Sequence, residues 1–243
     1  MTNLLHRVAW LLAIGLFGAI LATSSPASAT IVLKLDTAAM SDTASSIVMG
    51  RVEATRSYWE RGRIVTEIDL RVALPIKGLQ ETGAVVTVRQ FGGRVDELAQ
   101  LVPGTPQFSV GEQALVFLET VAEDLPPVVV GMAQGKYHLA VGPDERLWAV
   151  RNLDNLSLAV FEETASGERM MRLIDASAVA ESNALPLAVL LSEVAHDLKR
   201  SARPIPDALR ERLDADLNPS GHDFTTDFKA LGPRLDRAQE VTP

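Results

Sequence analysis

A long stretch of alternation between inward and outward side chains constrains this chain more than any other feature. From residue 64 onward, Ile64, Ile68 and Leu70 occupy one side of a period-two pattern, while charged residues such as Glu67 and Asp69 share the other side. Residues 47–54 alternate in the same way, and a polar turn at 60–63 contains Gly62. A period of two is typical of strands with one buried face. We expect a long hairpin from Ile47, through the turn, to a second strand ended by Pro75 and Gly78.

Further short strands follow the hairpin. Apolar runs predict strands at 84–91, 112–119, 128–130, 136–141 and 147–150. Within the strand at 112–119, the run from Ala114 to Leu118 is apolar, which favours a central position in the sheet. No helical pattern of ten or more residues separates the first four strands. Because parallel strands need long crossover connections, which are usually helices, this spacing argues against a parallel sheet. The chain is expected to be mainly β, with a small antiparallel Greek-key barrel and extra β-hairpins.

Helical patterns occur before the first predicted strand and again after the last one. Residues 36–45 predict a short helix, capped by the carboxylate of Asp36. After residue 176, five apolar residues recur at spacings of three and four, which predicts one buried helical stripe: Leu187, Leu190, Leu191, Val194 and Leu198. A charged helix is expected at Asp207–Leu217. We therefore expect a barrel domain at 30–175, C-terminal helices at 176–217 and a loosely ordered tail at 218–243.

The first 29 residues have the pattern of a secretory signal peptide. Arg7 is followed by an uncharged, mostly apolar run from Val8 to Ala22, and Ala27-Ser28-Ala29 provides small residues for cleavage. The expected mature chain begins at Thr30 and is exported to the periplasm or the extracellular medium. Cleavage removes Arg7 and takes the net charge from −8 to −9. An acidic surface disfavours nucleic acid, and no stable membrane insertion is expected after cleavage.

The residues offer little for catalysis or metal binding. With no cysteine, zinc–thiolate sites and cysteine nucleophiles are excluded. Glu193 and His196 have the E-x-x-H spacing, but a di-iron site needs two such motifs and further carboxylates. Glu67 and Asp69 share one strand face, where solvated side chains are far commoner than an acid–base pair. We assign no catalytic residue, no metal site and no cofactor.

Two segments are candidate binding surfaces. The tip of the first hairpin gathers aromatic and cationic side chains within eight residues: Arg56, Tyr58, Trp59, Arg61 and Arg63. Such clusters are typical of binding hot spots. The second candidate is the loop from Gly92 to Gly111, which carries Val102 and Phe108 and is longer than most loops in compact domains. In both places the alternative is that the side chains pack back on the barrel.

The order of strands between residues 46 and 118 resembles a known family. The segment begins with Ile47-Val48-Met49-Gly50-Arg51-Val52, continues with Leu70-Arg71-Val72, Lys77-Gly78 and Val85-Val86-Thr87-Val88, and ends with the run from Phe108 to Phe117. This order is similar to the OB-fold modules of tissue inhibitors of metalloproteinases, to netrin-like domains and to exported bacterial proteins of the same pattern. The resemblance implies a five-stranded Greek-key barrel that binds proteins. The inhibitors use a mature N-terminal cysteine, whereas this chain has Thr30 and no cysteine.

We therefore expect an exported, non-catalytic protein-binding module whose partner is another exported protein, with a metallopeptidase as one candidate. One alternative is a carboxylate-dependent hydrolase of the cell envelope, which would need a pocket holding two acids with perturbed pKa values. Another is a structural envelope protein that docks through its C-terminal helices.

Overall fold

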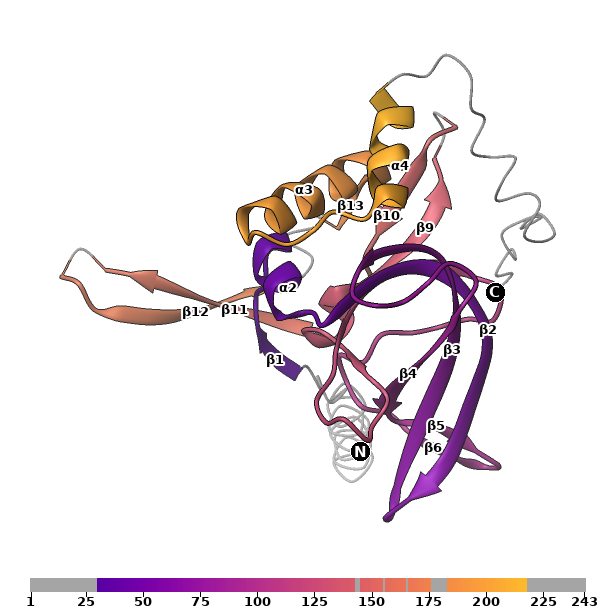
Figure 1. Ribbon diagram of the computed structural model, residues 1–243. Helices are drawn as coiled ribbons and strands as arrows, with labels where there is room; N and C mark the ends of the chain where they lie inside the picture. Colours follow the sequence, from indigo (N-terminus) through magenta and orange to yellow (C-terminus); the bar gives the residue numbers. More distant parts are fainter. Residues whose placement is uncertain (1–29, 143–144, 155, 165, 176–182, 218–243) are drawn as a thin grey trace, which may run out of the picture.

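The computed structural model of the protein describes residues 30–142, 145–154, 156–164, 166–175 and 183–217. The predicted leader (1–29), its cleavage site and the predicted tail (218–243) lie outside these residues. The described chain is mainly β, as expected, with antiparallel sheets and a few helices (Figure 1).

The predicted hairpin forms the centre of the molecule. β2 (Ser46–Glu60) and β3 (Arg63–Lys77) pair antiparallel over almost their whole length. Pro75 does not end β3 as expected. It lies opposite Val48 beside a register shift, and such an irregularity allows a residue that cannot donate a ladder hydrogen bond.

One sheet continues from both sides of this hairpin. β4 (Val85–Phe91) pairs with β3, and β7 (Gln113–Glu119) pairs with β2, which places β7 centrally as predicted. The sheet extends through β9 (Lys136–Val141) and β10 (Leu147–Val150) to β13 (Ala184–Pro186) at the edge. β8 (Val128–Val129) pairs with β7, off this path.

The sheet curls without closing into a continuous ladder. β4 lies at one end of the pairing order and β13 at the other. The curl brings β4 towards β8, where Arg89 N donates to Pro127 O at 2.8 Å. The closed barrel is therefore not confirmed. The expected long loop is also wrong in part, because β5 (Gly93–Val95) and β6 (Leu98–Gln100) form a small hairpin inside it.

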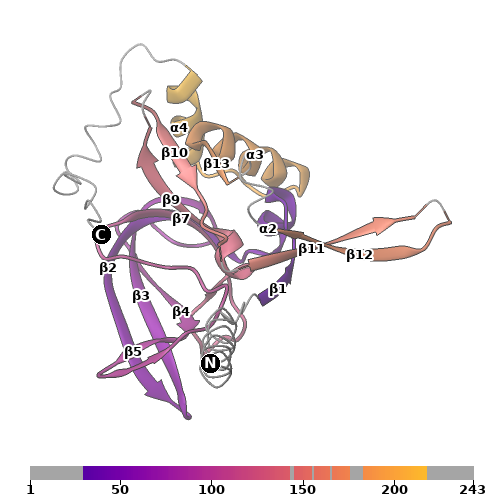
Figure 2. The ribbon, with the colours of Figure 1, turned by 180° about the vertical axis from the view of Figure 1, so that it is seen from behind.

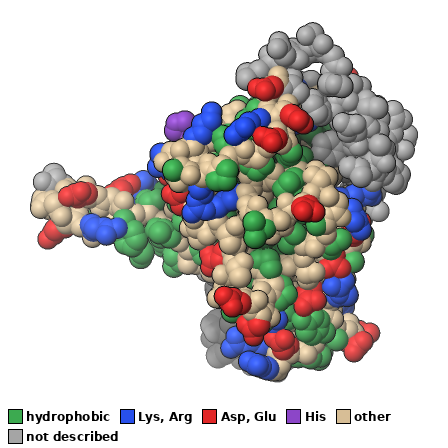
Figure 3. All heavy atoms as spheres, viewed as in Figure 1, with side chains coloured by type: hydrophobic (Ala, Val, Ile, Leu, Met, Phe, Trp, Pro, Cys, Tyr) green, Lys and Arg blue, Asp and Glu red, His purple; other side chains and the backbone are tan. Residues whose placement is uncertain are grey.

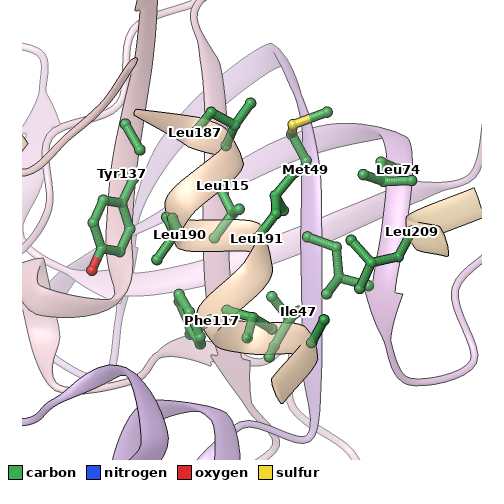
Figure 4. Close-up of a cluster of buried hydrophobic side chains, with 14 of the residues drawn as sticks. Ile47, Met49, Leu74, Leu115, Phe117, Tyr137, Leu187, Leu190, Leu191 and Leu209 are labelled. Carbon is green, nitrogen blue, oxygen red and sulfur yellow. The ribbon is translucent and has the colours of Figure 1, made fainter. Parts of the chain in front are cut away.

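Both faces of the central sheet are buried. Alternate residues such as Val48 and Val116 pack inside the curl, while Ile47 and Phe117 face the opposite way. The helix α3 (Leu187–Arg200) covers this second face, with its predicted leucine stripe against Phe117 (Figure 4). All five residues of the predicted stripe are buried. The C-terminal helix thus packs on the sheet.

Smaller elements complete this layer. α2 (Thr37–Thr43) begins as predicted, because the Asp36 carboxylate accepts a hydrogen bond from Ala39 N at 2.7 Å. The short 3-10 helix η1 (Met132–Gly135) precedes β9, and α4 (Asp207–Leu217) contributes Leu209 to the core beside α3.

A second, three-stranded sheet was not predicted. β11 (Leu156–Glu163) and β12 (Arg169–Asp175) form an antiparallel hairpin that projects from the body (Figures 1 and 2). β1 (Thr30–Leu33) pairs parallel with the base of β11, from Thr30 opposite Leu156 to Leu33 opposite Ala159. We call this three-stranded sheet the arm.

Candidate protein-binding surfaces

The strand pleat separates the two aromatic residues of the predicted hairpin-tip site. Tyr58 lies opposite Val65, and Trp59 opposite Ile64, in a ladder without a register shift at this point. Because successive side chains of a strand point to opposite faces, Tyr58 and Trp59 lie on different faces of the hairpin. The aromatic and cationic residues that are close in sequence therefore do not form one surface.

Charged groups on the Tyr58 face neutralise one another. Arg56 donates to Asp69, with Nη2 3.0 Å from Oδ1, and also lies 3.6 Å from Glu67. Tyr58 donates its hydroxyl to Glu67 at 2.7 Å. The hydrogen bond from Arg56, together with one from Thr87, lowers the pKa of Asp69, whereas the bond to Glu67 raises the pKa of Tyr58. The polar side chains on this face are thus already hydrogen-bonded to one another.

The remaining residues of the tip are separate from this network. Trp59 is 51% exposed. Arg61 occupies the turn with a positive φ of 48° and is exposed. The Arg63 guanidinium lies 5.7 Å from the centre of the Phe91 ring, a cation–π contact on the neighbouring strand.

The two predicted loop residues pack on the body. Phe108 is half-buried against the core inside the curl, with Lys136 Nζ 5.1 Å from its ring centre. Val102 is half-buried beside Gly92. Between them, Pro103 O accepts a hydrogen bond from the Thr30 hydroxyl at 2.8 Å, so this segment supports the base of the arm.

A buried ion pair lies beneath Phe108. The Glu112 carboxylate is 2.9 Å from Lys136 Nζ and 3.3 Å from His138 Nδ1. Burial alone would raise the pKa of Glu112, but the hydrogen bonds from His138 and Lys136 outweigh it and hold that pKa below its ordinary value. The lowered pKa favours a permanent carboxylate, which fits a structural ion pair better than a general acid.

An open hollow of about 500 Å³ lies between α2 and α3 and includes the Glu193–His196 motif. Its acids already serve the fold: Asp36 caps α2, and Glu193 accepts a hydrogen bond from the Thr37 hydroxyl at 2.9 Å. Asp197 lies 3.6 Å from Arg200. The described carboxyls with shifted pKa values, Asp69, Glu112 and Glu162, lie outside this hollow.

The described ranges contain neither a cluster of metal-binding side chains nor a helix that could span a membrane. Within them, no group of three or more histidine, aspartate or glutamate side chains could hold a metal ion. No helix within the same ranges has the length and apolar character needed to cross a membrane.

One face of the arm is anchored to the body. Leu156 and Leu158 of β11 are buried in a small core with Leu153 and Ala133, and Val32 and Ile174 pack against it. Gly104 approaches this core so closely that a Cβ atom there would lie 2.5 Å from Leu156 Cδ2. The base of the arm is thus fixed by packing on one side.

The opposite face of the arm is apolar and exposed. The ladder places Phe161 opposite Met171, Ala159 opposite Leu173, and Leu33 of β1 beside Ala159. The large side chains on this face are each 49–54% exposed: Ile31, Leu33, Phe161, Met171 and Leu173. Figure 3 shows hydrophobic side chains along the inner part of the arm and charged ones nearer its tip. We call these five residues the arm face.

Sequence reasoning missed the arm face. Two of its three strands, β11 and β12, have apolar residues on both the exposed and the buried face. The period-two contrast between polar and apolar residues is therefore weak. The available signal was the pair of short apolar runs flanking a polar turn, Leu156–Phe161 and Met170–Ile174.

Comparison of the chain with known proteins gave no matching family model, no matching curated protein and no matching solved structure.

Proposed function

We propose that this chain is an exported, non-catalytic protein-binding module that contacts its partner through the arm face. The observation that carries the proposal is the exposure of five large hydrophobic side chains on one side of a projecting sheet. Their exposed halves amount to an apolar patch on the order of 400 Å², the size of the largest patches on monomeric proteins, which are often functional.

The composition of the arm face also favours a protein partner. Aromatic residues and methionine are enriched where proteins meet, and here Phe161 and Met171 lie directly opposite each other. Arg169 stacks over Phe161 at 4.9 Å from the ring centre, so a polar rim lies beside the apolar centre. This arrangement of centre and rim is typical of binding hot spots.

Export, and the nature of the partner, belong to the same proposal. The leader pattern at 1–29 supports an exported partner, and the resemblance to inhibitor and netrin-like modules supports protein binding, with an exported metallopeptidase as one candidate. The helices are less suited to docking, because the apolar stripe of α3 already packs on the sheet.

The proposal is tested by partner capture with matched surface variants. Three baits are used to capture partners from the exported proteins of the source organism. They are the wild-type chain, the arm variant Phe161→Ser/Leu173→Ser and the hairpin variant Tyr58→Ala/Trp59→Ala. We expect one dominant, salt-resistant partner that the arm variant loses and the hairpin variant retains. Loss only with the hairpin variant would move the site to the predicted tip, and a partner retained by both variants would refute binding through either surface.

A further inference from the structure

The outer edge of the arm, β12, is a regular strand that lacks some of the usual edge protection. Among the described residues, β12 pairs only with β11, and the ladder runs without a register shift from Ser157 opposite Asp175 to Glu163 opposite Arg169. Natural edge strands are usually short, bulged, charged or interrupted by proline, because their free backbone groups attract other strands. β12 has seven residues without a register shift or a proline, and its charged residues are Arg169, Arg172 and Asp175.

The hydrogen-bond pattern shows which residues of β12 present free backbone groups. At the end of the hairpin, Thr164 N donates to Glu168 O at 2.8 Å. Antiparallel pairs alternate between bonded and non-bonded, so the backbone groups of Arg169, Met171 and Leu173 point to the outer edge. The other side of β11 agrees with this phase, because Lys34 N donates to Ala159 O, away from β12, at 2.8 Å.

The sequence of β12 is symmetric in its apolar positions. Met170 and Met171 precede Arg172, and Leu173 and Ile174 follow it. If a second β12 lies antiparallel with the two-fold axis at Arg172, Met171 of each copy is opposite Leu173 of the other. These two residues carry the outward backbone groups, so they can exchange hydrogen bonds. Met170 is then opposite Ile174 on the other face, and apolar residues meet apolar residues on both faces.

The charges at the axis balance as a group, because the Arg172 side chains that lie opposite each other each have an acidic partner. Arg172 Nε donates to Glu162 Oε1 at 2.8 Å within each arm. Two Arg172 side chains brought together at the axis therefore arrive with two Glu162 carboxylates, and the group as a whole is neutral. A strand from an unrelated protein would not supply the second carboxylate, so this edge favours another copy of the same chain.

We propose that two copies of this chain pair through their β12 edges, in antiparallel register about Arg172, and form one continuous sheet from both arms. The pairing uses backbone groups at the edge. On the arm face it brings Met171 of one copy beside Leu173 of the other and places no further layer over that face. The dimer would thus present two arm faces side by side to a partner. The inference goes beyond the proposed function and does not depend on it.

The first test separates backbone pairing from side-chain burial. The full chain, expressed with its leader and purified after export, is examined by sedimentation equilibrium alongside Met171→Pro and Met171→Ala. Proline removes the outward N–H and keeps an apolar side chain, whereas alanine keeps the N–H. We expect a wild-type dimer that Met171→Pro weakens at least tenfold and Met171→Ala weakens less than threefold. A wild-type chain that stays monomeric at about 100 μM, or equal weakening by both variants, would overturn the proposal.

A charge exchange tests the register without relying on a proline variant that could misfold. Arg172→Glu places acids from both copies at the axis and should weaken the dimer at least tenfold. Adding Glu162→Arg restores a neutral group and should return the dissociation constant to within threefold of wild type. A dimer that is unaffected by Arg172→Glu, or that is not rescued by the exchange, contradicts the two-fold axis at Arg172. Partner capture is measured separately, so failure of dimerisation does not count against the proposed binding function.

Discussion

Two hairpins project from the body of this protein (Figure 1). They differ in the side chains that they expose to solvent. The outer half of the β2–β3 hairpin pairs its charged groups with one another, as between Arg56 and Asp69. The β11–β12 hairpin instead exposes Phe161, Met171 and Leu173. The side chains of a projecting hairpin can therefore pair with one another, or they can leave apolar surface exposed that another molecule could cover. This contrast directs the search for a binding site to the arm.

The largest expected effect separates the two faces of the arm. Leu158→Ala removes a side chain that is 1% exposed at the arm base, and we expect a loss of about 2–4 kcal/mol in the free energy of unfolding. Leu173→Ala, on the arm face, is the matched control and should cost less than about 1 kcal/mol, because Leu173 is already 51% exposed. Urea denaturation measures both. Similar losses would show that the two faces are equally buried in solution.

A second variant tests how the β2–β3 hairpin is anchored. A Cβ atom at Gly50 would overlap the carbonyl oxygen of Arg71 on the paired strand. Gly50→Ala should therefore destabilise the protein by about 1–3 kcal/mol, since backbone must move to make room. Gly62→Ala at the hairpin tip meets open space and strains only its positive φ, at about 1 kcal/mol. Thermal unfolding in which Gly62→Ala is the more damaging change would contradict this order.

The buried ion pair between Glu112, just before β7, and Lys136 of β9 provides a contrast with the exposed pairs of the β2–β3 hairpin. Because the folded-state pKa of Glu112 lies below its ordinary value, its contribution to stability is present above about pH 4.5 and is lost as the pH falls through the folded-state pKa. Glu112→Gln should destabilise the protein by about 1–2 kcal/mol at pH 7, with Lys136 left buried. Denaturation from pH 7 to pH 3 should show the two proteins converging. A difference that stays constant with pH would rule out this linkage.

The smallest effect is expected at the surface of the β2–β3 hairpin. Arg56→Ala removes an exposed partner, and solvent screening makes such pairs weak contributors to stability. We expect no measurable change in the unfolding midpoint, but an upward shift in the pKa of Asp69, measured by NMR titration of its carboxyl group. An Asp69 pKa that does not move would show that the hydrogen bond from Arg56 is absent in solution.

Much of the fold was predictable because its signals are local. The alternation of residues 64–72 predicts β3, the five-residue leucine and valine stripe predicts α3, and Asp36 predicts the start of α2. These patterns depend on burial of one face, which the sequence records directly. The degree of sheet closure depends on the long-range approach of β4 to the segment before β8, where Arg89 N donates to Pro127 O, and no residue type is diagnostic of it.

The candidate site was harder to predict. Tyr58 and Trp59 are adjacent in sequence, and adjacency in a strand places side chains on opposite faces. The cluster of aromatic residues predicted at the hairpin tip is therefore divided between two faces of the strand. The arm face has the reverse problem, because Leu33 and Leu173 are distant in the sequence and are brought together on either side of Ala159. Only the parallel pairing of β1 with β11 assembles it.

That parallel pairing has a consequence for the order of folding. β1 is synthesised early. Its partners in β11, Leu156 to Ala159, are synthesised only after all strands of the central sheet except β13. The buried Gln134 then holds the chain just beyond β1, accepting from Leu35 N and donating to Leu33 O, each at 2.9 Å. Contacts so distant in sequence form slowly, because a long loop must close before they bring any gain. The first strand of the domain should thus be among the last to acquire protection from hydrogen exchange during refolding.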